Sequence, residues 1–360
     1  MTRKSIIIGA GCAGLSLARY KAEAGHPPHI ITDKSSENRP DHLWGFWRTS
    51  WLSEPAIAAK AKWHKWQICD DKHIITHHSD LHPYYGLMAS DWLASCVEKV
   101  TNAGGQIEIE DVMIKSDHLY FDSRPPQAPK GCLLQHFIGQ HITTDKPIFA
   151  ADTAILMDFR ADQSQGLHFM YLLPFSETEA LVESTLFTPQ ILADDDYRTA
   201  IKTYLATIFD CHDFTITHEE KGAIPLADLT PAKESFDDNI IPIGAASGAL
   251  RPSSGYGFAF IQAQAKEIAA RLANGKSPIP KLPHRRVDLW MDKVFLDVLE
   301  TTPQNSPDLF IKMAAALDGD EFATFMSGIA KPKTYLKVIL AMPKWIFIKS
   351  ALSVLTKGRS

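Results

Sequence analysis

A glycine-rich hexapeptide close to the amino terminus constrains the fold of this chain more than any other feature. Residues 9–14 read Gly-Ala-Gly-Cys-Ala-Gly, and they lie between a short β-branched run, residues 5–8, and a segment of helical character. At this spacing Gly9 permits a tight turn, Gly11 lets the backbone approach a pyrophosphate, and Gly14 allows the helix to pack closely on the strand. Free N–H groups at the start of the helix bind phosphates. The pattern therefore predicts a dinucleotide-binding βαβ unit.

An acidic residue completes this unit. Asp33 ends the second apolar strand, residues 29–33. In such units a carboxylate at this position accepts a hydrogen bond from a ribose 2′-hydroxyl. Asp33 is therefore a candidate cofactor-binding residue.

Bulk composition argues against several classes of protein. The net charge of −5 does not fit a protein that coats nucleic acid. The five cysteines are scattered without metal or redox spacing, which suits a reducing compartment such as the cytoplasm. His77, His78 and His82 also lack ligand spacing, so no metal site is expected. The first apolar run leads straight into the glycine-rich turn, so we expect no signal peptide. No apolar run has the length of a transmembrane helix.

Breaks in the pattern divide the chain into three parts. Pro125-Pro126 marks a domain crossing, and residues 126–234 then read as a mostly β substrate domain. Residues 1–125 and 235–280 form a discontinuous dinucleotide-binding domain, and residues 281–360 form a helical region. The fold class is therefore α/β, with a Rossmann-type domain.

Two segments resemble the large flavoprotein family built like the aromatic hydroxylases. Residues 240–246, an apolar strand that leads into Gly244, are similar to that family's second FAD-binding segment. Residues 120–124 are similar to its strand that returns to the nucleotide domain. The resemblance implies that the chain binds FAD, with Asp122 and Gly244 at the cofactor. The hydroxylases carry Gly-Asp where this chain has Gly244-Ala245, which argues against an ordinary hydroxylase.

Further motifs, in order along nearly the whole chain, resemble the FAD-dependent lycopene β-cyclases of carotenoid-producing bacteria. They are Asp-His-Leu-Trp-Gly-Phe-Trp at 41–47, Met-Asp at 157–158, Phe-Met-Tyr-Leu-Leu-Pro at 169–174, Leu-Val-Glu-Ser-Thr at 181–185 and Arg-Pro-Ser-Ser-Gly-Tyr-Gly at 251–257. The resemblance implies an isomerase that closes the ψ-ends of lycopene into β-ionone rings, giving γ-carotene or β-carotene without net redox change. It also implies that Gly255 and Tyr256 contact the cofactor.

The residue that matches the family's catalytic carboxyl is Glu183. Ring closure begins with protonation of a terminal alkene, and a carboxyl group in an apolar pocket can stay protonated near neutrality. Taken alone, a glutamate on a strand often faces solvent. Many members have an acidic residue next, where this chain has Ser184. Asp158 is therefore the candidate for a second acid or base, although it could instead pair with Arg160 or cap a turn.

In the resembled family FAD is used in its reduced form. The resemblance implies that reduced FAD stabilises the carbocation electrostatically and that NADPH is its reductant. No second G-x-G-x-x-G is present, so contact with NADPH should be transient. Aromatic rings also stabilise cations, and we expect one or two of them to line the site while the rest pack in the core. The candidates are Trp44, Phe46, Trp47, Tyr171 and Tyr256.

The C-terminal segment combines positive charge with apolar side chains. From Lys331 onward there are seven basic residues and no acidic residue, with apolar residues such as Trp345 between them and Pro343 as an interruption. This pattern is typical of a segment that lies on an anionic membrane surface, where a water-insoluble carotenoid resides. We therefore expect a protein peripheral to the inner face of the membrane. The alternative is a pair of helices packed on the substrate domain with their lysines outward.

Two other functions are open from the sequence. One is a redox flavoenzyme that acts on a polyprenyl or aromatic substrate, such as a geranylgeranyl reductase or a hydroxylase. The other is a non-catalytic carrier of carotenoid or flavin. A redox enzyme would change the mass of its substrate, and a carrier would tolerate the loss of the Glu183 carboxyl.

Overall fold

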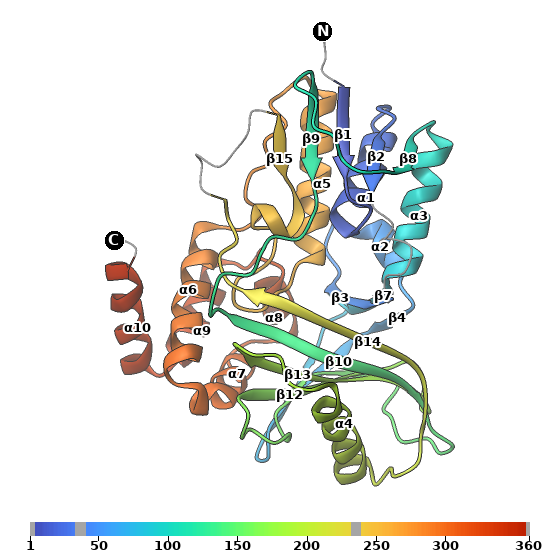
Figure 1. Cartoon of the computed structure of the whole chain (residues 1–360). Helices are drawn as coiled ribbons and strands as arrows, with labels where there is room; N and C mark the ends of the chain where they lie inside the picture. Colours follow the sequence, from blue (N-terminus) through green and yellow to red (C-terminus); the bar gives the residue numbers. More distant parts are fainter. Residues whose placement is uncertain (1–3, 33–40, 232–238, 358–360) are drawn as a thin grey trace.

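The computed structural model describes residues 4–32, 41–231 and 239–357. A five-stranded parallel sheet carries the amino-terminal unit (Figure 1). Its strands, in spatial order, are β15 (Ile240–Pro242), β9 (His118–Asp122), β1 (Lys4–Ile8), β2 (His29–Thr32) and β8 (Gln106–Ile109). Three helices pack in this region, namely α1 (Cys12–Glu23), α3 (Ala89–Asn102) and α5 (Phe258–Ala273). The sheet draws its strands from both segments of the predicted dinucleotide-binding domain, and the predicted α/β class is confirmed.

The sequence explains why this sheet forms. The runs at β1 and β2 are short, apolar and β-branched, as expected of parallel strands that are covered on both faces. Ile7, Ile30 and Phe121 have no exposed surface, and they belong to one cluster with side chains of α1 and α5. The core of the domain therefore lies between the sheet and its helices.

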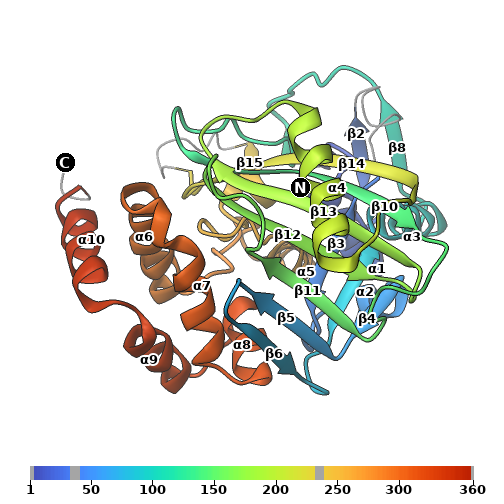
Figure 2. The same ribbon diagram turned by 90° about the horizontal axis from the view of Figure 1, so that it is seen from below.

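A seven-stranded sheet forms the second layer of the molecule (Figure 2). Its strands, in spatial order, are β14 (Thr215–Leu226), β10 (Leu133–Thr143), β13 (Glu179–Thr188), β12 (Leu167–Pro174), β11 (Thr153–Asp158), β5 (Lys65–Cys69) and β6 (Ile74–His78). All neighbours are antiparallel except β11 and β5. Helix α4 (Asp194–Phe209) covers one face. The sheet thus includes two strands from the first 125 residues, which the sequence interpretation placed in the other domain.

A small sheet lies between the two large ones and holds the aromatic-rich segment (Figure 1). It is formed by β3 (Leu43–Trp47), β7 (Tyr84–Met88) and β4 (Ala61–Trp63), with α2 (Ser53–Ala58) beside it. Gly45 and Gly86 face each other in its centre. A Cβ atom at Gly45 would collide with the hydroxyl of Tyr84. Glycine is therefore required where this sheet approaches Tyr84 and Tyr171.

The carboxyl-terminal region is helical, as predicted, and stands at one side of both sheets (Figures 1 and 2). It consists of α6 (Arg286–Thr301), α7 (Ser306–Ala315), α8 (Gly319–Met326), α9 (Pro332–Ala341) and α10 (Lys344–Lys357). In the described part of the chain, no single helix has the length and apolar character needed to cross a membrane. Helices α9 and α10 meet these criteria only together, and they are bent by 113° at their junction. Pro343 explains the bend, because it forces Met342 into an extended conformation (ψ 148°).

Candidate active site

One cavity of about 710 Å³ connects the three parts of the molecule. Its wall includes Cys12 at the start of α1, Glu183 on β13, Tyr256 before α5 and Phe347 on α10. Most of its other lining residues are apolar or aromatic. A ligand in this cavity can therefore reach from the glycine-rich turn to the C-terminal helices without leaving an apolar environment.

The glycine-rich turn has the backbone geometry expected of a phosphate cradle. Gly9 has a φ of +94°, a conformation that other residues rarely adopt. A Cβ atom at Gly14 would collide with the carbonyl oxygen of Gly9. Gly11 begins α1 without a capping side chain, and the first turn holds no acidic residue. The N–H groups and the positive end of the helix dipole are therefore uncompensated and fit a phosphate group.

Of the two acidic residues predicted at the cofactor, the structure describes only Asp122, which does not line the cavity. Asp33 lies outside the described residues. Asp122 ends β9, where its main-chain oxygen accepts a hydrogen bond from the Ile243 N–H at 2.8 Å. Its carboxylate forms an ion pair with Arg124, with 2.6 Å between Oδ2 and Nη2. The ribose contact of Asp33 and the cofactor contact of Asp122 stay predictions.

Two glycines of the domain's second segment, Gly244 and Gly255, lie near the glycine-rich turn and the cavity. Gly244 has a φ of +66°, and a Cβ atom there would lie 2.5 Å from the Cβ of Ala13 in α1. Its N–H donates to Oε1 of Gln264 at 2.8 Å. Gly255 has a φ of +62° and lines the cavity beside Tyr256. The segment at residues 240–246 is thus held directly against the start of α1, as expected if both segments bind one nucleotide.

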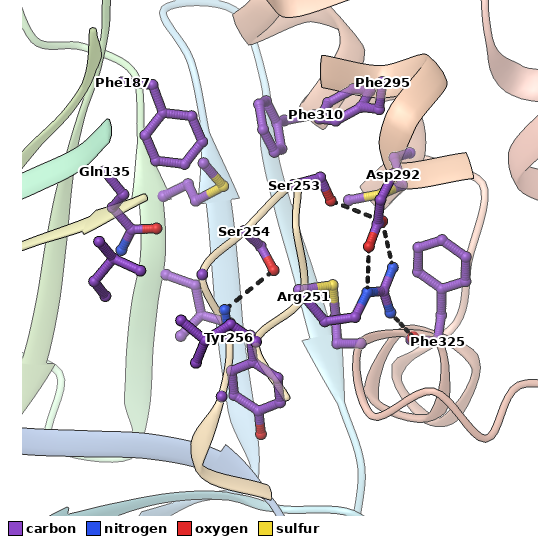
Figure 3. A pocket seen from close by; sticks show the side chains of 18 of the residues that line it. Gln135, Phe187, Arg251, Ser253, Ser254, Tyr256, Asp292, Phe295, Phe310 and Phe325 are labelled. Carbon is purple, nitrogen blue, oxygen red and sulfur yellow. Dashed lines mark hydrogen bonds and ion pairs between the residues drawn. The ribbon is translucent and has the colours of Figure 1, made fainter. Parts of the chain in front are cut away.

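Figure 3 shows how the loop before α5 is anchored. Arg251 and Asp292 of α6 form a buried, bidentate ion pair, with Nε–Oδ2 at 2.8 Å and Nη2–Oδ1 at 2.7 Å. The hydroxyl of Ser253 donates to Oδ1 of Asp292 at 2.8 Å. Because the two charges neutralise each other, this end of the cavity carries no unpaired charge and can bind a hydrocarbon. The surrounding wall is aromatic, with Phe187, Phe295, Phe310 and Phe325.

Glu183 lies on the cavity face of the seven-stranded sheet. It is 8% exposed and lines the cavity, so the solvent-facing alternative does not hold. Burial raises the pKa of its carboxyl to about 8, with a further contribution from the negative charge of Glu220. The hydroxyl of Thr185 donates to Oε1 at 2.5 Å and opposes this shift. Glu183 can therefore carry a proton at neutral pH inside an apolar cavity.

Tyrosine hydroxyls lie next to this carboxyl. Tyr171 on β12 is the cross-strand neighbour of Glu183. Its hydroxyl oxygen lies 2.9 Å from that of Tyr84, which comes from the small sheet. Burial raises the pKa of both phenols above their ordinary range, so both are neutral. They form a polar but uncharged wall beside the acid.

The predicted aromatic candidates separate into wall and core. Trp44, Trp47, Tyr171 and Tyr256 line the cavity, whereas Phe46 is fully buried and packs against Phe258. The hydroxyl of Tyr256 accepts a hydrogen bond from the Trp47 N–H at 3.2 Å. More of the candidates therefore reach the cavity than the one or two expected.

Asp158 lies on the opposite face of the sheet from Glu183. Its Oδ2 is 2.5 Å from Nη2 of Arg160 and accepts a hydrogen bond from the hydroxyl of Tyr204 in α4 at 2.7 Å. It is fully buried and is absent from the cavity wall, which its neighbour Met157 reaches instead. Of the two sequence interpretations, the structure has the pair with Arg160. The physical reason is an irregularity in β11, whose register shifts between Ile155 and Asp158. Leu156 and Met157 both line the cavity, and the extra residue turns Asp158 to the opposite face.

Sequence reasoning missed Glu220 on β14. This residue is 2% exposed, and its Oε2 accepts a hydrogen bond from the Leu43 N–H at 2.9 Å. Burial raises the pKa of its carboxyl to about 7. Gly139 of β10 is the cross-strand neighbour of both Glu183 and Glu220. The alternation of residues 215–226 could have suggested a strand, but only the register of three strands brings the two glutamates together.

A histidine pair adjoins this second carboxyl. Among the described residues, His141, His218 and Glu220 bring possible ligand atoms within 4.8 Å of one another. His141 Nε2 is 4.0 Å from Oε2 of Glu220 and makes no hydrogen bond. The sequence interpretation considered His77 instead, whose Nε2 lies 3.0 Å from the carbonyl oxygen of Ala314. The absence of a metal site stays a prediction.

Comparison with known protein families finds one match that covers nearly the whole chain. The family model described as lycopene cyclase protein matches residues 5–352. The chain is 24% identical over 305 residues to the lycopene beta-cyclase of Paracoccus sp. (strain N81106 / MBIC 01143), covering 76% of this chain and 74% of the relative. It is 23% identical over 379 residues to the lycopene beta-cyclase of Pantoea ananas, covering 98% of both chains.

Solved structures share the fold at low sequence identity. A geranylgeranyl bacteriochlorophyll reductase-like protein from Thermoplasma acidophilum has a TM-score of 0.64 and 11% identity, covering 96% of this chain and 98% of that one. A flavin-dependent brominase has a TM-score of 0.62 and 14% identity, covering 99% of both chains. The chain therefore has the fold of these proteins.

Proposed function

Because this chain belongs to the lycopene cyclase protein family, whose model matches residues 5–352, we propose that it is a lycopene β-cyclase. The proposed reaction closes the ψ-ends of lycopene into β-ionone rings and yields γ-carotene or β-carotene. The observation that carries the proposal is the carboxyl group of Glu183. It is buried in an apolar cavity, no cation among the described residues pairs with it, and burial raises its pKa to about 8.

The chemistry needs a protonated acid beside a hydrocarbon. In the proposed mechanism the Glu183 carboxyl transfers its proton to the terminal alkene of lycopene. The next double bond attacks the resulting carbocation and closes the six-membered ring. The ring then loses a proton to the Glu183 carboxylate, which regenerates the acid, so the substrate is isomerised with no change in mass. The buried site favours the first step because it holds the acid in its neutral form until the alkene arrives.

Neighbouring aromatic groups support the second step. Trp47 and Tyr256 pack against each other in the cavity wall, with ring centroids 5.8 Å apart. Tyr84 and Tyr171 stay neutral beside Glu183. Such rings attract positive charge through their π faces and do not trap it as a nucleophilic anion would. The wall therefore suits a carbocation while the apolar lining keeps water away.

We propose FAD as the cofactor, with its phosphates at Gly9, Gly11 and Gly14. The fit is supported by the positive φ of Gly9 and by the uncapped start of α1. Gly255 and Tyr256 line the same cavity as Cys12 and Glu183, which supports one continuous space for the proposed cofactor and the proposed acid. When bound, reduced FAD supplies an electron-rich ring that stabilises developing positive charge electrostatically. NADPH is the proposed reductant.

Helices α9 and α10 are the proposed contact with the cytoplasmic face of the membrane. Their outward apolar side chains are strongly exposed; Trp345 is 80% and Leu340 is 61% exposed. Lysines of the same helices supply positive charge, although Lys333 and Lys337 also pair with Glu321. Ile339, Phe347 and other residues of these helices line the cavity. A carotenoid could thus pass from lipid to Glu183 along an apolar surface.

A vesicle-binding measurement tests this contact. The double variant Trp345→Gln, Leu340→Gln should bind anionic vesicles about tenfold more weakly. The control is Ile57→Gln, which removes an exposed apolar side chain far from this region. Equal binding by wild type and the double variant would contradict the proposed membrane contact.

Expression in a lycopene-accumulating host, followed by pigment chromatography, tests the activity. The wild type should convert lycopene to pigments of unchanged mass with one or two rings. Unchanged lycopene in a well-expressed, FAD-loaded strain would contradict the cyclase. A product with a different mass would favour the redox alternative. The fold is compatible with that alternative, because a geranylgeranyl bacteriochlorophyll reductase-like protein shares it.

A further inference from the structure

We propose that Glu220 is a positioning residue for the reaction, whose negative charge holds the proton on Glu183 across the gap left by Gly139. This inference rests on the proposed function only in assigning Glu183 as the acid. The two carboxyl groups can be compared without substrate, so the inference can be tested separately.

The register of three strands brings the two carboxyl groups together. Gly139 on β10 pairs with Glu183 on β13 at one side and with Glu220 on β14 at the other. Cross-strand neighbours point to the same face of a sheet, and this face carries the cavity. A Cβ atom at Gly139 would lie 3.0 Å from Cδ1 of Leu181, 3.2 Å from Cγ of Glu220 and 3.5 Å from Cβ of Glu183. Gly139 itself therefore places no side chain between the two glutamates.

The two glutamates have different hydrogen-bond partners, and this difference decides which ionises first. Glu220 accepts a hydrogen bond from the Leu43 N–H, and nearby His218 also favours its ionised form. Within the described part of the chain, Glu183 has only the hydroxyl of Thr185 as a hydrogen-bond donor. A main-chain N–H is an obligatory donor, whereas a hydroxyl can also donate elsewhere. Glu220 is thus the carboxylate of the pair, and Glu183 keeps the proton.

Other titratable groups face the pair from each neighbouring element, and none of them is a cation bound to Glu183. Burial lowers the pKa of His42 and that of His141, the latter to about 4, so both are neutral near pH 7. The remaining groups are Tyr84 from β7, Tyr171 from β12, His218 from β14, Asp41 before β3 and Lys60 before β4. Two carboxyl groups in one buried site cannot both ionise easily, so the charge of one raises the proton affinity of the other.

The test is a pH titration of the protonated carboxyl stretch in the infrared spectrum of the FAD-loaded protein. Glu183→Gln assigns the band of Glu183. In Glu220→Gln the midpoint of that band should move to lower pH by about one unit. The matched control is Glu219→Gln, because Glu219 adjoins Glu220 but points to the other face and pairs with Arg198. The control should leave the midpoint unchanged.

Turnover supplies a second measurement. The high-pH limb of the kcat profile should move to lower pH in Glu220→Gln, in parallel with the infrared midpoint. In Glu220→Asp, which keeps a carboxylate, this limb should lie close to its wild-type position. An unchanged midpoint in Glu220→Gln, or an equal shift in Glu219→Gln, would overturn the inference. A wild type that makes no ringed pigment would overturn the cyclase proposal and leave the infrared result to be judged alone.

A second variant covers the case in which Glu220→Gln does not fold. In Glu183→Gln the midpoint of the Glu220 band should stay where it is in the wild type, because Glu183 is neutral while Glu220 ionises. A fall of that midpoint in Glu183→Gln would show that Glu183 ionises first, and it would overturn the inference.

Discussion

The two faces of the seven-stranded sheet differ in whether their acidic side chains are paired with a cation. On the face toward α4, Asp158 is paired with Arg160, and Glu219 is paired with Arg198. On the cavity face, Glu183 and Glu220 have no cation bound to them in the part of the chain that the structure describes, and burial raises the pKa of both. The same strands supply both faces, and Glu219 and Glu220 are consecutive residues. An acid that is paired with a cation stabilises the sheet as a carboxylate. An unpaired buried acid has a raised pKa, stays protonated and can donate its proton.

The largest expected difference between the faces concerns turnover. Glu183→Gln should reduce ring formation by about three orders of magnitude, because the amide cannot donate the proton. Glu219→Gln, on the α4 face, should stay within about twofold of wild type, because it touches neither the cavity nor Glu183. Pigment yield at equal protein and FAD content measures both. Normal cyclisation by Glu183→Gln would show that the acid is another group.

The next effect concerns the free energy of unfolding. Arg160→Met leaves the Asp158 carboxylate buried without its cation and should cost about 3 kcal/mol. Urea denaturation at neutral pH measures this change. The pH dependence of turnover should be unaltered, since Asp158 does not line the cavity. A large shift of the pH profile in this variant would mean that the two faces are coupled.

The pH dependence of stability should also distinguish the faces. The native pKa of Glu183, about 8, lies above its ordinary value of 4.5, so the folded protein binds an extra proton between these values. Its contribution to stability is complete below pH 4.5 and is lost as the pH rises through 8. Between pH 6 and pH 8 this loss is about 2 kcal/mol.

Glu183→Gln should therefore flatten the decline and be more stable than wild type at pH 8.5. Denaturation at a series of pH values, with Glu219→Gln as the control, measures the difference. A wild-type curve that rises from pH 6 to pH 8.5 would contradict the proton count for this face.

The smallest effects come from a matched pair of tyrosines. Tyr204→Phe removes the hydrogen bond to Asp158 and should lower stability by about 1 kcal/mol with little change in turnover. Tyr171→Phe should do the reverse, changing turnover severalfold with little loss of stability, because its hydroxyl faces Tyr84 and Glu183 in the cavity. Thermal unfolding and initial rates of the two variants, measured side by side, would reveal any exchange of these roles.

Local sequence signals predicted the dinucleotide-binding unit well. The strand, turn and helix of the fingerprint are contiguous, and the structure has them as β1, Gly9 to Gly14 and α1. The motif that contains Glu183 also identified a strand residue, although alternation alone did not decide which face it occupies. These predictions succeeded because each one depends on neighbours in the chain.

Non-local pairing limited the rest. Glu220 became part of the site only through two registers that meet at Gly139, and no pattern within residues 215–226 distinguishes it from Glu219. In the same way, the parallel pairing of β5 with β11 assigns residues 65–78 to the large sheet rather than to the nucleotide-binding domain. The motif around Asp158 led to the prediction that this residue belongs to the site, but its position on β11 turns its side chain toward α4.

The hairpin of β5 and β6 sets a condition on how the chain can fold as it is synthesised. Trp66 and His77 of this hairpin are buried in the finished protein, and the His77 ring contacts carbonyl oxygens of Ala314 and Leu317. One edge of the hairpin pairs with β11, and one face packs against α7 and α8, and all three elements come later in the chain. A ribosome-bound chain therefore exposes an unpaired, aromatic hairpin until most of its sequence has emerged. Folding of the large sheet is a late event, and a chain cut before α8 would leave that hairpin open to aggregation.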